Sequence, residues 1–179
     1  MPHEATLDPT ANGLVPRGDG WFVLNARGAR WWHADGRTAV CGIEGDVDFP
    51  ELGLNVSVLE PGELLAMYNW EADQEDFLVL AGEGLLLVEG QERRLRRWDF
   101  VHCPPDTKHI IVGAGEGPCV VLALGARQNQ EGPGWGGYTV DDVARSHGAG
   151  VDAATNDPNE AYARFEEPFP VAYGGWLPI

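Results

Sequence analysis

Short apolar segments separated by turn residues fill the first two thirds of this chain. The breaks between segments carry glycine, proline or aspartate, as at residues 35–36, 60–62 and 82–84. Short strands at regular spacing with such turn signals are typical of all-β sandwiches and barrels. We therefore expect strands at residues 21–24, 38–43, 54–59, 64–70, 77–81, 85–89, 92–97, 100–103, 109–112 and 119–124.

The pattern changes after residue 125, where helix-start signals replace the alternation. Residues 139–142 resemble a capped helix start. Residues 157–160 combine an aspartate cap, a proline at the first helical position and a glutamate within reach of the cap. The sequence thus predicts three parts: a loose N-terminal arm (1–20), an antiparallel β-barrel (21–125) and a C-terminal extension with short helices (126–179).

Aromatic residues are frequent near the end of the chain, at Phe169, Tyr173 and Trp176. A free tail does not need so many large apolar side chains, so we expect the extension to pack on the barrel or on a partner subunit. Exposed strand edges of an open barrel are a second reason to expect a partner subunit.

Charge and length narrow the class of protein. The 179 residues suit one domain, and 28 acidic against 12 basic residues give a net charge of −16. This acidity disfavours binding to nucleic acids and to anionic membranes. We find no secretory signal and no apolar stretch long enough to span a bilayer. Cys41, Cys103 and Cys119 form no C-x-x-C pair, so we expect a reduced, cytoplasmic protein.

Residues 61–112 resemble the two conserved motifs of the cupin superfamily. In the first motif Gly62 opens the pattern, Glu75 takes the glutamate position and Gly82 closes it, with six residues between Glu75 and Gly82. In the second motif Pro104 and His109 keep the family spacing. Trp98 and Asp106, by contrast, replace the two glycines of the second motif.

The resemblance implies a single antiparallel cupin barrel, a double-stranded β-helix or jelly roll, with a mononuclear metal or small-ligand site inside. It also implies a homodimer, in agreement with the aromatic ends and open edges of the chain. For activity it implies a small-molecule dioxygenase, isomerase or lyase.

The first motif lacks the His-x-His pair of the family and has Tyr68-Asn69-Trp70-Glu71 instead. Side chains alternate faces along a strand, so either Tyr68 and Trp70 or Asn69 and Glu71 point inward. We favour Asn69 and Glu71, because polar groups in a barrel mouth find partners in a metal or ligand. Tyr68 and Trp70 then pack outward.

The resulting candidate ligands are Asn69, Glu71, Glu75 and His109. Carboxylate oxygens with one imidazole suit Mn²⁺ or Fe²⁺, and Zn²⁺ through the histidine and the glutamates. Glu71 and Glu75 are also the candidate catalytic residues, as general bases whose pKa burial would raise. His102, just before the prolines of the second motif, and Tyr68, in the other register, are further candidates to line a substrate cavity.

Two functions remain open at this point. The retained Glu75 and His109 favour an enzyme, whereas the lost His-x-His pair favours a non-catalytic binding protein with a degenerate metal site. The family fold hosts many activities, so the sequence alone does not choose between them.

Overall fold

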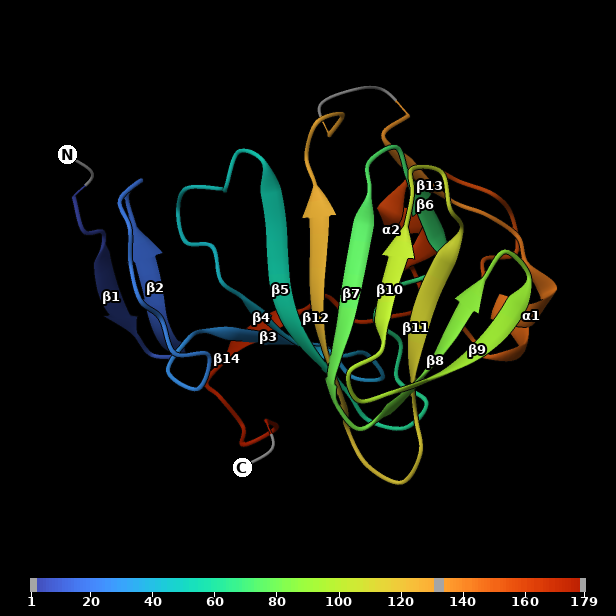
Figure 1. The fold of residues 1–179 in the computed structure, drawn as a ribbon, viewed down its shortest axis with the longest axis horizontal. Coiled ribbons are helices and arrows are strands. Elements are labelled where there is room, and N and C mark those ends of the chain that lie inside the picture. Colours follow the sequence, from blue (N-terminus) through green and yellow to red (C-terminus); the bar gives the residue numbers. More distant parts are fainter. Residues whose placement is uncertain (1–2, 131–133, 178–179) are drawn as a thin grey trace.

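Two antiparallel sheets face each other in the computed structural model, which describes residues 3–130 and 134–177 (Figure 1). Within these residues, the larger sheet has seven strands in the order β10-β7-β12-β5-β4-β3-β14, and the smaller has five in the order β13-β6-β11-β8-β9. The expected all-β antiparallel barrel is therefore confirmed. The strands are β1 (Thr6–Thr10), β2 (Gly13–Arg17), β3 (Trp31–His33), β4 (Ala39–Gly42), β5 (Leu52–Leu59), β6 (Asn69–Glu71), β7 (Glu75–Ala81), β8 (Glu83–Val88), β9 (Gln91–Arg96), β10 (Phe100–Cys103), β11 (His109–Ala114), β12 (Cys119–Ala126), β13 (Gly136–Tyr138) and β14 (Phe169–Val171), and the helices are α1 (Asp142–Ser146) and α2 (Pro158–Ala161).

Apolar side chains from both sheets fill one end of the space between them. Leu59, Val79 and Val121 of the large sheet pack with Leu86 and Ile111 of the small one, all of them buried. Each fully buried side chain of this size stabilises the fold by about 1.5–3 kcal/mol. This core holds the two sheets together.

Toward the other end of the barrel, the inward positions of the same strands become polar. Along β5 the inward residues run from Leu59 through Ser57 to Asn55, and along β7 they run from Val79 to Glu75. The side-chain period of two keeps all of these positions on one face. The strands thus place a polar site directly above an apolar core.

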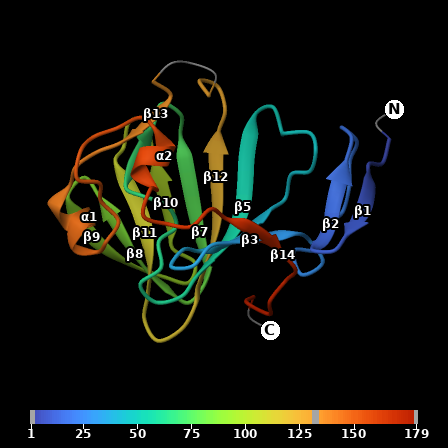
Figure 2. The ribbon, with the colours of Figure 1, turned by 180° about the vertical axis from the view of Figure 1, so that it is seen from behind.

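The two short helices cover the outer face of the small sheet (Figure 2). Ala144 of α1 and Ala161 of α2 are buried against apolar side chains of β8 and β11. The first helix begins within the predicted start at residues 139–142, where the side chain of Asp141 accepts a hydrogen bond from the Ala144 N–H. The second begins at the predicted cap, Asp157, whose side chain accepts one from the Asn159 N–H. Covering by these helices explains why β11 is apolar on both faces.

The end of the chain covers the outer face of the large sheet instead. Trp31 is fully buried there, with ring centroids 5.7 Å from that of Tyr173 and 5.1 Å from that of Trp176. The Trp31 indole N–H donates to the Ala26 carbonyl at 2.8 Å. The aromatic end of the chain is therefore part of the core of this protein.

The structure differs from the sequence expectation in the first twenty residues. In place of a loose arm, β1 and β2 form a hairpin, which Figure 1 shows beside the barrel. Gly13 allows its tight turn with a φ of 120°, which other residues rarely adopt, and Arg17 pairs with Asp8 across the strands. The expectation of a loose arm is therefore wrong, because the turn residues of this segment encode a hairpin.

Two of the expected strands are also different. Residues 21–24 form no strand, and Val23 is 80% exposed. Of residues 64–70 only the last two belong to β6, because the Tyr68 N–H bonds to the Ala149 carbonyl of the extension rather than to a neighbouring strand. The apolar content of these two segments does not determine whether their backbone groups pair with a neighbouring strand.

The three cysteines are buried and free. Cys41 lies beneath Trp31, whereas Cys103 and Cys119 belong to the barrel core. In the described part of the chain, the helices are too short and polar for any of them to cross a bilayer.

Candidate functional site

A cavity of about 170 Å³ lies at the polar end of the barrel, between the two sheets. All four candidate ligands predicted from the sequence, Asn69, Glu71, Glu75 and His109, line it. A second cavity of about 320 Å³ shares Glu71 and Glu75 with the first and continues past the ends of β5 and β12. The two carboxylates therefore stand where the inner cavity meets the outer one.

His109 presents one ring nitrogen to the cavity. Its Nδ1 lies 2.9 Å from the Thr107 carbonyl oxygen, which only accepts hydrogen bonds, so Nδ1 carries the proton. The Phe77 ring packs against the imidazole with centroids 5.3 Å apart. Burial lowers the pKa of His109, although the Thr107 hydrogen bond and the charge of Glu89 act in the opposite direction. The neutral ring therefore turns the lone pair of Nε2 toward the cavity.

Glu75 faces that nitrogen from the opposite sheet. Its Oε2 lies 3.4 Å from His109 Nε2 and, within the described residues, is a buried oxygen with no hydrogen-bond partner. Burial raises the pKa of Glu75 to about 8, and the nearby Glu71 carboxylate adds to the rise. At neutral pH the favoured form is thus a protonated carboxyl beside a neutral imidazole.

Glu71 is the second titratable group of the cavity. Burial raises its pKa to about 7, with a further contribution from the charge of Asp73. Asp73 itself is held by hydrogen bonds from the Asn129 N–H at 2.9 Å and the Trp135 indole N–H at 3.3 Å. This fixed negative charge raises the pKa of Glu71 toward that of Glu75.

The two remaining candidates, Tyr68 and His102, lie away from this cavity. Tyr68 is buried on the other side of the small sheet, where its hydroxyl oxygen accepts from the Gly90 N–H at 3.4 Å. His102 stands opposite Asp76 with Nδ1 2.7 Å from that carboxylate, and its side chain is 51% exposed. Alternation along β10 turns Val101 and Cys103 inward instead, which corrects the expected substrate-lining role of His102.

Comparison with known proteins agrees with this architecture. Residues 55–125 match the family model of the cupin domain. These residues form a cupin domain. The match covers β5 to β12 and therefore includes every strand that contributes one of the four candidate ligands to the cavity.

Solved structures similar to this cupin include a candidate sugar phosphate isomerase from Acidithiobacillus ferrooxidans, with 26% identity and a TM-score of 0.47. A sugar phosphate isomerase of the cupin superfamily from Silicibacter pomeroyi has 22% identity and a TM-score of 0.45. Both alignments cover 51% of this chain and 60% of the other chain. A DMSP lyase from Ruegeria pomeroyi has 24% identity and a TM-score of 0.44, with 54% of each chain covered. Comparison with curated proteins gave no match.

The cupin cavity also contains polar residues that we did not predict. Asn55 and Ser57 line it from β5, and the Ser57 hydroxyl donates to the Asn55 side-chain oxygen at 2.8 Å. At the outer cavity Arg127 pairs with Glu44, with guanidinium-to-carboxylate distances of 2.6 and 2.8 Å. The alternation of polar and apolar residues in 55–58 was the available signal for the first pair. The second pair joins residues 83 positions apart and left no local signal.

The donor set of this cupin can be tested against the metal ion that the family implies. His109 Nε2 and the unpartnered Glu75 Oε2 are two suitable donors 3.4 Å apart. However, no three His, Cys, Asp or Glu side chains of the described residues lie close enough together to hold one ion. The residues as placed do not fit a metal held by three such ligands, so we derive no step through one.

Proposed function

We propose that this cupin is a small-molecule enzyme of the isomerase or lyase type, in which Glu71 and Glu75 exchange a proton with a substrate held between the sheets. The observation that carries the proposal is the Glu75 Oε2 atom. It is buried at the cavity without a hydrogen-bond partner in the described structure, and it faces the His109 Nε2 lone pair at 3.4 Å. An unpaired polar atom in such a place is costly unless a bound molecule satisfies it.

The roles of the three residues follow from their surroundings. Ionised Glu71 would take a proton from a substrate carbon next to a carbonyl group, while protonated Glu75 gives its proton to the carbonyl oxygen, which leaves a neutral enol. If the deprotonated carbon also bears a hydroxyl group, ionised Glu75 takes the proton of that hydroxyl while Glu71 gives its proton to the former carbonyl carbon, which completes an isomerisation. If the next carbon bears a leaving group, that group departs with its bonding electron pair while ionised Glu75 takes back the enol proton, which completes a lyase reaction. His109 is a positioning residue that orients Glu75.

Proton exchange with solvent tests this proposal without knowledge of the natural substrate. A panel of small aldehydes, ketones and hydroxy acids is incubated with the protein in D₂O and followed by proton NMR. We expect loss of the signal next to the carbonyl group for at least one compound. Glu75→Gln should slow that exchange by about 10²- to 10⁴-fold, because Gln cannot give up a proton as an acid.

The matched control for this experiment is Glu116→Gln, which makes the same change at an exposed position in the turn between β11 and β12. It should exchange at the wild-type rate. Equal rates for wild type and Glu75→Gln would contradict the acid–base proposal. Binding of a panel compound without any exchange would favour the non-catalytic alternative.

A metal-dependent function is the second candidate, favoured by the same pair of free donor atoms. We propose that the missing donor is the imidazole that Asn69 replaces, since Asn69 lies directly opposite His109 in the strand register. Asn69→His should therefore raise Mn²⁺, Fe²⁺ or Zn²⁺ content well above that of the native protein, as measured by elemental analysis after purification without a tag. A full equivalent of metal in the native protein would contradict the view that this site is degenerate.

The assembly and location of the protein also remain proposals. The homodimer expected from the aromatic ends and open edges has a candidate contact at β10, the edge strand of the large sheet, where Trp98 and Phe100 are each 62% exposed. We also propose a cytoplasmic location from the free cysteines, a small-molecule partner from the cupin domain, and no nucleic-acid or membrane partner from the net charge of −16.

A further inference from the structure

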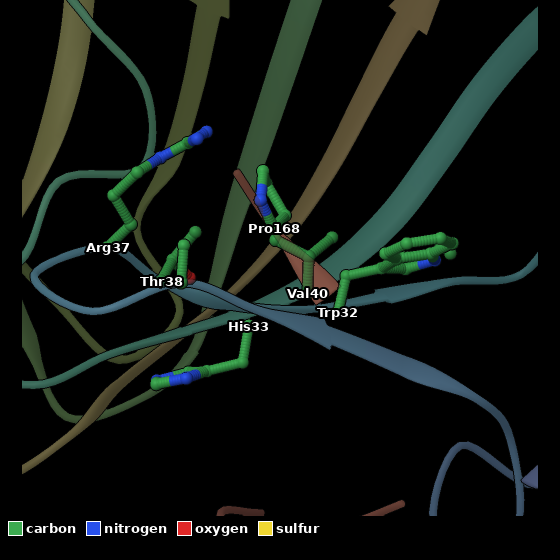
Figure 3. A pocket seen from close by; sticks show the side chains of 8 residues that line it. Trp32, His33, Arg37, Thr38, Val40 and Pro168 are labelled. Atoms are coloured by element: carbon green, nitrogen blue, oxygen red, sulfur yellow. The ribbon is translucent and has the colours of Figure 1, made fainter. Parts of the chain in front are cut away.

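A cavity of about 450 Å³ lies on the flank of the barrel, beside β3 and β4. In Figure 3 the side chains of Trp32, Arg37, Val40 and Pro168 stand on one side of this strand pair. His33 points to the other side, where its ring stacks 6.3 Å from that of Trp176. The flank cavity is thus separate from the aromatic cover of the large sheet.

Arg37 supplies the only positive charge among the residues that line the flank cavity. Its guanidinium lies over the Tyr162 ring at 4.4 Å and near the Phe165 ring at 5.8 Å. Within residues 3–130 and 134–177, this guanidinium makes no hydrogen bond and no ion pair with a carboxylate. Stacking holds the group in place and leaves its N–H donors free for a ligand.

The walls around Arg37 are apolar. Trp32 is 36% exposed, and Val40 and Pro168 complete the surface against which a ligand would pack. A planar fork of donors beside such walls matches a molecule with a carboxylate at one end and an aromatic or branched aliphatic body.

The flank cavity adjoins the site at Glu75. Val40 lines the flank cavity, the inner cavity and the outer cavity, and Gly42 lines the flank and outer cavities. A molecule anchored at Arg37 would therefore extend along β4 toward the two carboxyl groups.

We propose that the flank cavity binds small organic carboxylates, with the carboxylate on the Arg37 guanidinium and the apolar body against Trp32. That the bound molecule is also the substrate of Glu71 and Glu75 rests on the function proposed above. Binding itself does not depend on it.

Phenylacetate is a suitable probe, and its neutral analogue phenylacetamide is the matched ligand control. Titration calorimetry or ligand-observed NMR of the wild-type protein should show binding of phenylacetate at least about tenfold tighter than that of phenylacetamide, because a charged hydrogen-bonded pair is lost in the amide. Arg37→Met should weaken phenylacetate binding by about tenfold or more.

Arg97→Met is the matched protein control, since Arg97 also lies over an aromatic ring, at 4.8 Å from Trp98, and bears the same charge. It should bind phenylacetate within about twofold of wild type. Trp32→Ala removes an apolar contact surface of the cavity and keeps the charge of Arg37. It should therefore weaken the binding of phenylacetate and of phenylacetamide by a similar factor. Melting temperatures of all variants show whether they fold.

Three results would overturn the proposal: no binding of phenylacetate to wild type, equal affinity for acid and amide, or wild-type affinity in folded Arg37→Met. Glu75→Gln separates the two proposals made for this protein. It should abolish proton exchange while leaving phenylacetate binding within about twofold, so failure of the chemistry and failure of the carboxylate site give different results.

Discussion

Glu75→Gln is expected to make the protein more stable than wild type at alkaline pH. In the folded protein the pKa of Glu75 is raised from 4.5 to about 8, so the folded state holds this proton more tightly than the unfolded chain does. The stability gained in this way is fully present below pH 4.5 and is lost as the pH rises through about 8. Glu71, with a pKa raised to about 7, acts in the same direction. A glutamine has a similar shape and stays neutral at every pH, so the variant does not lose this stability as the pH rises.

The measurement is the melting temperature of wild type and variant between pH 5 and pH 9. Between these limits we expect wild type to lose roughly 5–10 °C relative to Glu75→Gln, on the basis of about 2–4 °C for each kcal/mol in a chain of this size. Glu116→Gln, at an exposed site, should follow wild type. Parallel curves for wild type and Glu75→Gln would mean that Glu75 is ionised in the folded protein at neutral pH.

His109 contributes with the opposite sign. Its pKa is lowered by burial, so the folded state resists protonation, and the corresponding stability is lost as the pH falls below the ordinary value of 6.5. Above pH 4.5 both glutamates lose stability as the pH rises, so the stability that His109 gains up to pH 6.5 offsets only part of that loss, and these three groups together favour the acid side of neutrality.

Trp31→Ala is expected to have the second large effect, a loss of about 3–5 kcal/mol in the free energy of unfolding. Trp31 is completely buried between the large sheet and the aromatic end of the chain, so its removal leaves a cavity and an unpaired Ala26 carbonyl. Urea unfolding monitored by far-UV circular dichroism measures the loss.

Trp21→Ala is the matched control, because Trp21 is 53% exposed and lies outside the proposed dimer contact. It should change the free energy of unfolding by less than about 0.5 kcal/mol. Similar losses for both variants would show that the end of the chain does not form part of the core as described.

The barrel could be predicted from local pattern because its strands are bounded by strong turn signals. Glu89 and Gly90 show why: both have positive φ, as a two-residue hairpin turn requires, and they join β8 to β9 where the sequence predicts a break. Asp141 and Asp157 set the helix starts for a similar local reason.

The features that the sequence did not reveal depend on contacts between distant segments. The interpretation of residues 64–70 as one strand was wrong because Ala149 competes for the backbone of Tyr68. The pairing of Arg127 with Glu44 and the approach of Arg37 to Tyr162 likewise join residues far apart in the chain. Within the site, alternation decided which residues of 68–71 face the cavity. The effect of the Asp73 charge on the pKa of Glu71 could not be predicted, because it depends on the folded loop.

The three free cysteines are buried, so their reaction with a thiol reagent can report local opening of the folded protein. Burial raises the pKa of Cys41 and Cys119 to about 11 and that of Cys103 to about 12, so a thiol-alkylating reagent meets almost no thiolate in the closed state. Each alkylation event then marks an opening of the region around one thiol. Cys41 under Trp31 records detachment of the chain end, whereas Cys103 and Cys119 record separation of the two sheets. The order in which the three become alkylated would give the order in which the layers of this protein come apart.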